Sequence, residues 1–250
     1  MKKAALSLRP NINCEVPSTA MVMAAGLGKR MRPLTATRPK PLIELAGKPM
    51  IDHVFDHLKD AGVKKAVVNV HYLADAIEGH LQTIDGIEIA VSDERDELLE
   101  TGGGIVHAME HIDSDPFISC NSDNFWVDGP TNSLKILASH WDDEKMDALL
   151  LLVPHARSFN HKGRGDFHMD RQGRITRRGP TKIAPYVFTG IQMLSKRLFT
   201  DVPDGRFSTN ILWDRAIEAG RCYGVSHPGL WFDVGYPHAI QETELALEDG

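Results

Sequence analysis

Two glycines and a series of cations follow the first apolar run of the chain, in the stretch MVMAAGLGKRMRPLTATRPKPL at residues 21–42. Gly26 and Gly28 lack a Cβ, so backbone N–H groups there can approach the oxygens of a phosphate closely. Arg30 offers a planar guanidinium that can bridge two phosphate oxygens, whereas Lys40 offers a compact point charge. The stretch therefore predicts a phosphate site.

Two common phosphate-binding motifs do not fit this stretch. The dinucleotide fingerprint requires a third glycine at the position where Met31 stands, which weakens an NAD interpretation. The P-loop requires a Lys-Ser/Thr pair after its last glycine, whereas the Gly47-Lys48 pair is followed by a proline. The phosphate therefore belongs to another class of ligand.

Two aspartates that are far apart in the sequence each follow a short apolar run. Asp123 lies in CNSDN and Asp233 lies in WFDVG. A single Asp at the end of a strand is commonly a cap or a turn residue. Two of them beside a phosphate site suggest Mg²⁺, which proteins hold with one or two carboxylates, phosphate oxygens and waters. We therefore expect Mg²⁺ as the cofactor and these two aspartates as its ligands.

Three consecutive glycines stand in LLETGGGI, at residues 98–105. Glycine costs backbone entropy and is a poor helix former, so this position must require a close approach to the backbone. Two explanations are open. A nucleotide base or a sugar could lie over the glycines, or the glycines could allow a helix to pack tightly on its neighbours.

Alternating strands and helices are predicted to position these residues. The continuous apolar run TAMVMAA is typical of a strand buried on both faces, and MIDHVFDHLKDAGV predicts a helix capped by Gly62. Strands are predicted at 19–25, 64–70, 87–92 and 116–123, and helices at 50–63, 73–82 and 103–112. This alternation predicts a mostly parallel sheet with right-handed crossovers.

The second half of the chain has a more mixed pattern, with a hairpin predicted around Gln172-Gly173. Further helices are predicted at 133–144, 209–220 and 238–248, and further strands at 147–154, 186–194 and 222–227. We therefore predict an α/β fold with a single domain at 19–250, whose mixed, mostly parallel central sheet is flanked by helices. Residues 1–18 are expected to form a loosely ordered extension.

Ligands of open α/β sheets bind at the carboxyl ends of the strands. The loops at 26–40, 92–104 and 121–124 follow predicted strands, and the late segment FDVG at 232–235 is similarly rich in Gly and Asp. We therefore expect these four segments to form one site.

Composition excludes several other functions. The formal net charge of −6 argues against non-specific nucleic-acid binding, which requires a cationic face. Cys14, Cys120 and Cys222 have neither the number nor the spacing of a disulfide framework or a zinc site. No apolar run approaches the length of a membrane span or signal-peptide core. We expect a cytoplasmic protein without nucleic-acid or membrane binding, and no protein partner is evident.

Beyond these local arguments, the motifs resemble a known family over most of the chain. AAGLGKRMRPLTATRPKPLIELAGKPMI resembles the signature of sugar-1-phosphate nucleotidylyltransferases, approximately GxGxRMxPLTxxxPKPL followed by GKP. LETGGGI, an Asp after the fourth strand, GRGDF, FTGI and WFDVG follow in the order seen in that family. The pair LETGGG and GRGDF is most similar to the bacterial N-acetylmuramate-1-phosphate uridylyltransferases of peptidoglycan recycling.

The resemblance implies a Rossmann-like fold of the GT-A type and a reaction between a nucleoside triphosphate and a sugar 1-phosphate that gives an NDP-sugar and pyrophosphate. It implies catalytic roles for Arg30 and Lys40 and metal binding by Asp123 and Asp233. The implied nucleotide-binding residues are Ala25, Gly26, Gly28, Glu100, Gly102 and Gly103, and the implied sugar-binding residues are Asn121, Gly165 and Thr189. UTP and N-acetylmuramate 1-phosphate are the implied substrates.

The chemistry of this reaction agrees with what the sequence lacks. A sugar 1-phosphate is already ionised near neutral pH, since the second pKa of a phosphate monoester is about 6, so the nucleophile needs no general base. The site must instead supply positioning and charge neutralisation. The chain accordingly shows no evident Ser/His or His/Asp constellation.

Two alternatives remain open at the level of the sequence. A guanylyltransferase could join GTP to mannose 1-phosphate or a heptose 1-phosphate, if a carboxylate of Glu97 or Glu100 accepted hydrogen bonds from guanine N1 and N2. A non-catalytic nucleotide-sugar sensor would be expected to have lost one of the signature charges, all of which are present. The family's EKP element is absent, and the candidates for the cation that holds the sugar phosphate are Arg164, Arg177, Arg178 and Lys182.

Overall fold

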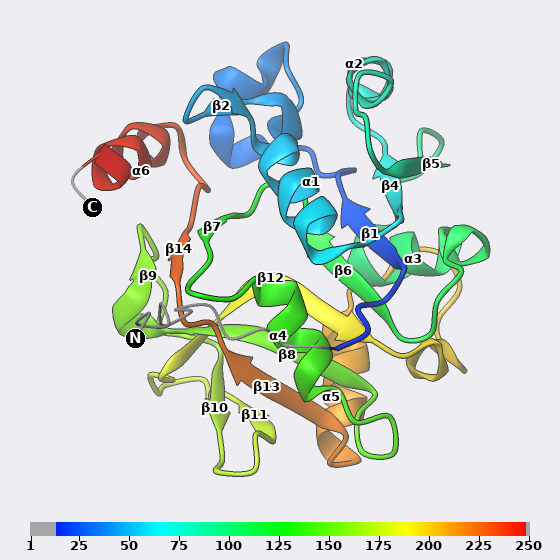
Figure 1. The fold of residues 1–250 in the computed structure, drawn as a ribbon, viewed down its shortest axis with the longest axis vertical. Coiled ribbons are helices and arrows are strands. Elements are labelled where there is room, and N and C mark those ends of the chain that lie inside the picture. Colours follow the sequence, from blue (N-terminus) through cyan, green and yellow to red (C-terminus); the bar gives the residue numbers. More distant parts are fainter. Residues whose placement is uncertain (1–13, 249–250) are drawn as a thin grey trace, which may run out of the picture.

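The computed structural model describes residues 14–248, which form one large mixed sheet with helices on both faces (Figure 1). The strands are β1 (Thr19–Met23), β2 (Glu44–Leu45), β3 (Lys48–Pro49), β4 (Lys65–Val70), β5 (Glu88–Asp93), β6 (Phe117–Asn121), β7 (Phe125–Val127), β8 (Ala148–Pro154), β9 (Ser158–Phe159), β10 (Phe167–Met169), β11 (Ile175–Arg177), β12 (Tyr186–Leu194), β13 (Cys222–Ser226) and β14 (Leu230–Phe232). The helices are α1 (Met50–Ala61), α2 (Ala74–Leu81), α3 (Glu100–His107), α4 (Ser133–His140), α5 (Asn210–Glu218) and α6 (Pro237–Glu248).

The main sheet confirms the predicted fold class. β5, β4, β1 and β6 are neighbours in that order and all run parallel. β12 then pairs antiparallel with both β6 and β8, and β13 pairs parallel with β8. The hairpin of β10 and β11 joins the beginning of β12. The antiparallel pairs made by β12 and by the β10–β11 hairpin make the sheet mixed.

Most predicted elements are present, with shifted ends. The C-cap of α1 is Gly62, with φ 95°, and Gly173 turns the predicted hairpin with φ 85°. Helix α3 begins at Glu100 rather than 103, because the glycines form its first turns, and it ends at His107 before a 3₁₀ turn. Helix α4 ends at His140 because the next residue is extended. The short strands β2, β3, β7, β9 and β14 were not predicted.

Each face of the sheet is covered by its own helices. One core cluster joins apolar residues of α1, α2 and α4 to β1 and β4, with Phe55, Ile77 and Leu137 fully buried. The other joins α3 and α5 to the opposite face, where Ile105 and Trp213 are buried. Because strand residues alternate between these clusters, the parallel strands are apolar on both faces, as their continuous hydrophobic runs predict.

A third core cluster lies beside the phosphate loop. It joins Met31 in that loop and Met50 at the start of α1 to Phe232 and Val234 near β14, and α6 packs against it. Figure 1 shows α6 at the margin of the molecule beside β2, where Glu244 accepts a hydrogen bond from the backbone of the β2–β3 turn. The C-terminal helix thus supports the segment that carries WFDVG.

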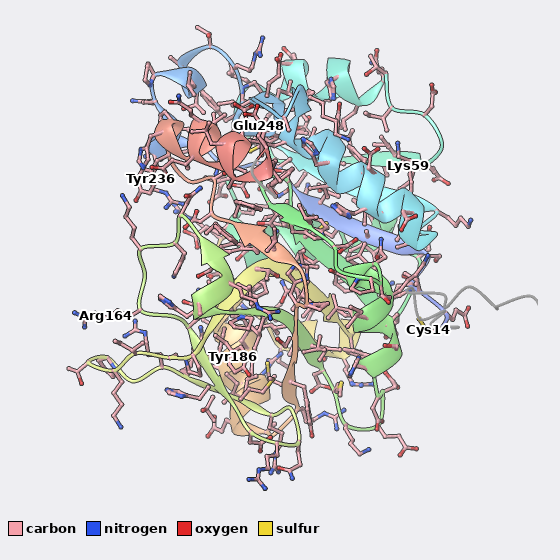
Figure 2. All side chains as sticks on the ribbon, turned by 60° about the vertical axis from the view of Figure 1, so that its left-hand side comes forward. Cys14, Lys59, Arg164, Tyr186, Tyr236 and Glu248 are labelled. Atoms are coloured by element: carbon pink, nitrogen blue, oxygen red, sulfur yellow. The ribbon has the colours of Figure 1, made fainter. Side chains whose placement is uncertain are left out.

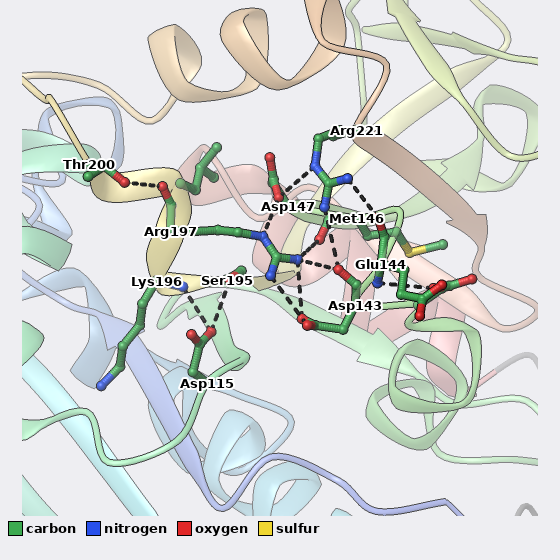
Figure 3. A network of polar contacts seen from close by, with 12 residues as sticks. Asp115, Asp143, Glu144, Met146, Asp147, Ser195, Lys196, Arg197, Thr200 and Arg221 are labelled. Carbon is green, nitrogen blue, oxygen red and sulfur yellow. Dashed lines mark hydrogen bonds and ion pairs between the residues drawn. The ribbon is translucent and has the colours of Figure 1, made fainter.

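An ion-pair network stabilises the end of the sheet that lies away from the phosphate loop (Figure 3). Asp147, just before β8, accepts hydrogen bonds from Arg197 Nε at 2.6 Å and from Arg221 Nε at 2.9 Å. Arg197 also pairs with Asp143 at 3.2 Å. Hydrogen bonds to these carboxylates raise the pKa of Arg197. Because β8 and β13 begin here, the network lies at their amino ends, and its role is structural.

Within residues 14–248, no helix has the length and apolar character that crossing a membrane would require. Cys120 and Cys222 are buried free thiols, and burial raises the pKa of each to about 12. The predicted loose extension falls largely on residues 1–13, outside the described residues. At residue 14, the Cys14 thiol donates a hydrogen bond to the Lys135 carbonyl on α4.

Candidate active site

The phosphate loop after β1 is folded into short 3₁₀ turns at Lys29–Met31, Leu34–Ala36 and Lys40–Leu42. Gly28 has φ 58° and begins the first turn. Its carbonyl accepts a hydrogen bond from the Thr35 hydroxyl at 2.8 Å, and a Cβ at Gly28 would lie 3.1 Å from Lys40 Cβ. Glycine is therefore required here both by the backbone conformation and by the return of the loop past its own start.

A first pocket of about 460 Å³ lies at the carboxyl ends of β1 and β6. Its walls come from all the loops that were expected to meet there, together with Gly235 of the WFDVG segment. The predicted site residues that line it are Ala25, Gly26, Gly28, Arg30, Lys40, Glu100, Asn121 and Asp123. These loops therefore meet around one pocket, as predicted.

A second pocket of about 220 Å³ adjoins the first. The predicted residues Thr189 and Asp233 line it, and so do residues that the sequence did not single out. Those are His161, Asp166, Val187, Phe188, Gly190 and Trp231, and the segments already expected at the site add Asn124, Phe232 and Val234. β12, β14 and the segment after β9 supply most of this wall.

Four residues line both pockets: Arg30, Lys40, Asn121 and Asp123. Two of them are the cations of the phosphate loop, and the other two stand at the end of β6. A ligand in either pocket would therefore lie against the same pair of cations.

Lys40 and Asp123 form an ion pair at the boundary between the pockets. Lys40 Nζ lies 2.6 Å from Asp123 Oδ2, and the side chains are 11% and 33% exposed. The lysine is thus held in place by burial and by its partner, while the carboxylate still reaches the pockets. Ser122, which precedes Asp123, fixes the loop because its hydroxyl and its N–H both donate to the Met23 carbonyl of β1.

Asp233 is half-buried and lines the second pocket. Burial alone would raise the pKa of its carboxyl group, but the contact with His161 opposes burial and holds that pKa below its usual range. His161 Nδ1 lies 3.5 Å from Asp233 Oδ2, and the charges of Arg30 and Lys40 contribute in the same direction. Asp233 therefore remains ionised at neutral pH.

Arg30 is exposed and lies beside the segment that carries Asp233. Its guanidinium carbon is 5.3 Å from the centroid of the Tyr236 ring, a cation–π contact. A Cβ at Gly235 would lie 2.9 Å from Asp233 Oδ1 and 3.2 Å from an Arg30 nitrogen. Figure 2 shows Tyr236 at the start of α6. Gly235 thus allows the arginine and the aspartate to face each other.

The consecutive glycines lie in α3, packed against the segment before α5. Gly102 N and Gly103 N donate to the Phe207 carbonyl at 2.8 and 3.1 Å. A Cβ at Gly103 would lie 3.2 Å from the Gly205 carbonyl carbon, and its oxygen would be closer still. Tight packing therefore accounts for these glycines. Glu100, at the start of the helix with φ 61°, lines the first pocket and pairs with Arg206 at 2.6 Å.

A buried amide and carboxylate connect the glycine helix to the phosphate loop. Asn69 at the end of β4 accepts a hydrogen bond from Ala24 N at 2.7 Å and donates to Glu94 at 2.6 Å. Glu94, 2% exposed, also accepts from Leu99 N at 3.1 Å. The sequence analysis missed this relay, although a polar residue inside the apolar run KKAVVNV was a signal for it.

The predicted sugar residues are placed differently from one another. Asn121 lines both pockets, whereas the hydroxyl of Thr189 is fully buried and donates to the Leu151 carbonyl at 2.8 Å. Gly165 has φ 74° and precedes Asp166, which does line the second pocket. Gly165 is thus a backbone requirement at the edge of that pocket.

Two of the four candidate cations for the sugar phosphate are engaged elsewhere. Arg177 pairs with Asp214 at 2.7 Å. Arg178 donates to the carbonyls of Gly165, Gly179 and Lys182. Arg164 is exposed on the segment before β10, where Figure 2 shows it on the outer side of the molecule. The cations that line the second pocket are instead Arg30 and Lys40.

The two adjoining pockets share a pair of cations, Arg30 and Lys40, and this charge is suited to anionic ligands such as phosphates. Comparison with known proteins identifies the class. Residues 19–250 match the family described as nucleotidyl transferase. The chain therefore belongs to this family, and its relatives place it among the sugar-1-phosphate nucleotidyltransferases, which transfer a nucleotidyl group from a nucleoside triphosphate to a sugar 1-phosphate.

Two of the relatives match 90% or more of the chain at over 30% identity. N-acetylmuramate alpha-1-phosphate uridylyltransferase of Caulobacter vibrioides is 41% identical over 94% of this chain and 99% of that protein. The enzyme of the same name from Neisseria meningitidis is 34% identical over 90% of this chain and 96% of that protein. Enzymes of this family generally depend on a divalent metal ion.

Solved structures agree at the level of the fold. The inositol-1-phosphate CTP transferase of T. maritima superposes with a TM-score of 0.75 at 19% identity, over 95% of this chain and 98% of that one. The structure thus has the fold of nucleotidyltransferases, as the sequence predicted.

Proposed function

We propose that the protein joins UTP to N-acetylmuramate 1-phosphate, giving UDP-N-acetylmuramate and pyrophosphate, as a step of peptidoglycan recycling. The observation that carries this proposal is the pair of adjoining pockets that share Arg30, Lys40, Asn121 and Asp123. The first, larger pocket is the proposed nucleotide site, and the second, smaller pocket is the proposed sugar site. The two relatives named above support the choice of UTP and of the sugar.

The nucleotide is proposed to bind with its phosphates along the loop after β1. Ala25, Gly26 and Gly28 would present backbone groups to the triphosphate, and all three line the larger pocket. Glu100 would border the base, with Gly102 and Gly103 behind it in α3. In the smaller pocket, Asn121 and the backbone near Gly165 and Thr189 would contact the sugar.

The reaction needs charge neutralisation more than proton transfer. An oxygen of the ionised sugar phosphate attacks the α-phosphorus of UTP in line, and the bond to the pyrophosphate oxygen breaks. Arg30 can bridge two oxygens of the α-phosphate and of the leaving group, while Lys40 supplies a point charge fixed by Asp123. Because both cations line both pockets, they can offset the repulsion between the two anionic substrates before attack.

Asp123 and Asp233 are proposed to hold Mg²⁺. Both line the smaller pocket, and the low pKa of Asp233 keeps its carboxylate ionised. In the described part of the chain, no cluster of three or more metal-ligating side chains occurs. Two carboxylates suit Mg²⁺, which completes its coordination with substrate phosphates and waters. When bound, the ion would neutralise charge on the phosphates.

The carboxylates near the predicted base site support UTP over GTP. A guanine would need an acceptor for both N1 and N2. Glu97 is exposed, and Glu100 Oε1 already accepts two hydrogen bonds from Arg206. A non-catalytic sensor is disfavoured because Arg30, Lys40 and both aspartates are not merely present but meet around the two pockets.

A substrate matrix tests the proposal. Pyrophosphate release would be measured with Mg²⁺ for each of the four nucleoside triphosphates against the 1-phosphates of N-acetylmuramate, N-acetylglucosamine, glucose and mannose. We expect UTP with N-acetylmuramate 1-phosphate to give the highest kcat/KM. A higher value for GTP with mannose 1-phosphate would establish the guanylyltransferase alternative, and no turnover with any pair would revive the sensor.

A further inference from the structure

Asp166 is the one carboxylate lining the smaller pocket that the proposed reaction does not use. It stands just before β10, is half-buried, and lines the smaller pocket but not the larger one. The ion pairs of this pocket are those of Asp123 with Lys40 and of Asp233 with His161, and Asp166 takes part in neither. A carboxylate in a pocket without a cation of its own therefore calls for another partner.

The backbone around Asp166 is fixed by several hydrogen bonds. Asp166 N donates to the Tyr186 carbonyl of β12 at 2.7 Å, and the Asp166 carbonyl accepts from Arg178 N at 2.8 Å. The Arg178 side chain also donates to the Gly165 carbonyl at 2.9 Å. A Cβ at Gly165 would lie 2.9 Å from the Ala184 carbonyl carbon, so the chain passes this neighbour too closely for a side chain. The position of Asp166 at the pocket wall is thus set by the fold.

The two carboxylate oxygens of Asp166 have different surroundings. Oδ2 accepts a hydrogen bond from Phe188 N at 2.9 Å, which holds the carboxylate at the wall that Val187 and Phe188 form. Oδ1 has no hydrogen-bond partner among residues 14–248 and is not fully buried. Since a carboxylate oxygen accepts hydrogen bonds, Oδ1 is an acceptor that a ligand in the smaller pocket can use.

The charges around the pocket decide which part of a sugar 1-phosphate can face Asp166. The phosphate is expected at Arg30 and Lys40, which line both pockets, whereas Asp166 lines only the smaller one. A carboxylate repels a phosphate and cannot donate a hydrogen bond to it. Its partner must therefore be a neutral donor, and on the side of a sugar ring opposite the 1-phosphate the donors are hydroxyl groups. In N-acetylmuramate the 3-position carries the lactyl ether, so these hydroxyls are at positions 4 and 6.

We propose that Asp166 is a specificity-determining residue whose Oδ1 accepts a hydrogen bond from a sugar hydroxyl opposite the 1-phosphate, at position 4 or 6. The contact from Phe188 N already holds the side chain in place, so little conformational freedom is lost when the sugar binds. This inference rests on the proposed function for the identity of the smaller pocket. It adds the residue that recognises the far side of the sugar.

Asp166→Asn is the central variant because it is nearly isosteric. The amide oxygen can still accept from Phe188 N, while an NH₂ group replaces Oδ1 and the negative charge is lost. We expect KM for N-acetylmuramate 1-phosphate to rise at least about 10-fold, since hydrogen bonds to a charged group are the stronger kind. We expect kcat, KM for UTP and the melting temperature to change little.

Two further variants frame this result. Asp166→Ala also removes the contact with Phe188 N, so it should lower the melting temperature as well as raise the same KM. Asp85→Asn is the matched control, because Asp85 is exposed between α2 and β5. Its substitution should leave both KM values and the melting temperature unchanged.

Deoxy analogues test the contact from the side of the ligand. The 4-deoxy and 6-deoxy forms of N-acetylmuramate 1-phosphate each lack one candidate donor. Wild-type protein should show a KM at least about 10-fold higher for one of them. With that analogue, Asp166→Asn should add no further loss, because both changes remove the same hydrogen bond. The wild-type arm tests the inference even if Asp166→Asn fails to fold.

Three results would overturn the inference. The first is an unchanged KM for N-acetylmuramate 1-phosphate in folded Asp166→Asn protein. The second is a wild-type KM that neither deoxy analogue raises. The third is a loss in Asp166→Asn that is equal for the parent sugar and for both analogues, which would indicate a structural role.

Failure of the proposed function looks different. Turnover with another sugar 1-phosphate of the substrate matrix, and none with N-acetylmuramate 1-phosphate, would reject the proposed substrate. The same comparison with the deoxy analogues of that other sugar would then decide the role of Asp166.

Discussion

Substitution of Gly103 by alanine tests whether the glycines of α3 serve helix packing or nucleotide binding. In a helix, Gly→Ala should stabilise by about 1 kcal/mol. At Gly103 the new Cβ would lie 3.2 Å from the Gly205 carbonyl carbon and 3.2 Å from Leu99 Cβ, and would overlap the Gly205 oxygen. Such overpacking costs typically about 1–3 kcal/mol, and a backbone neighbour cannot rotate away. We therefore expect a net loss of up to about 2 kcal/mol from these two opposing effects.

Gly79→Ala is the matched control. Gly79 lies in α2, is exposed, and an added Cβ would meet nothing within 4 Å. This substitution should stabilise by about 0.5–1 kcal/mol. Urea unfolding followed by circular dichroism would measure both variants. Opposite signs are expected. If Gly103→Ala were as stable as wild type and only the KM for UTP rose, the glycines would serve the nucleotide and the packing argument would be refuted.

Three further predictions concern the site and its support. Arg30→Ala should lower kcat at least about 100-fold, as the loss of a preorganised charge-stabilising group does, with an unchanged melting temperature; near-normal turnover at saturating substrate would exclude its role. Asn69→Ala should raise KM for UTP and destabilise by about 1–3 kcal/mol because Ala24 N and Glu94 lose their buried partner; full stability and normal KM would contradict this. Asp128 is buried, and although burial opposes its ionisation, hydrogen bonds from neighbouring groups hold its pKa below the ordinary 3.8. The ionised carboxylate of Asp128 therefore stabilises the fold at pH values above its pKa. The difference in free energy of unfolding between wild type and Asp128→Asn, measured in urea, should shrink as pH falls below about 4; a difference that stays constant with pH would refute this.

Much of the fold follows from local sequence patterns. The continuous apolar runs of β1, β4 and β6 predict strands buried on both faces, and the structure places them side by side in the sheet. The helical spacing that ends at Gly62 predicts α1 nearly to its last residue. These features depend on neighbours in sequence, which is why they could be predicted.

The parts that could not be predicted depend on long-range contacts. The start of α3 is set by the carbonyl of Phe207, more than a hundred residues away. His161 stands in an irregular segment without periodicity, and only the fold brings it to Asp233. The pairing of Lys40 with Asp123 likewise joins two loops. Motif spacing identified the charged residues of the site, whereas their partners and the second pocket required the structure.

The central claim is that a sugar phosphate attacks the α-phosphorus of a nucleoside triphosphate between the two pockets. The most direct measurement follows the label from UTP that carries ³²P at either the α or the γ position, with N-acetylmuramate 1-phosphate and Mg²⁺. The α label should appear in the nucleotide sugar and the γ label in pyrophosphate. Transfer of the γ label to the sugar, or its release as orthophosphate, would contradict the claim.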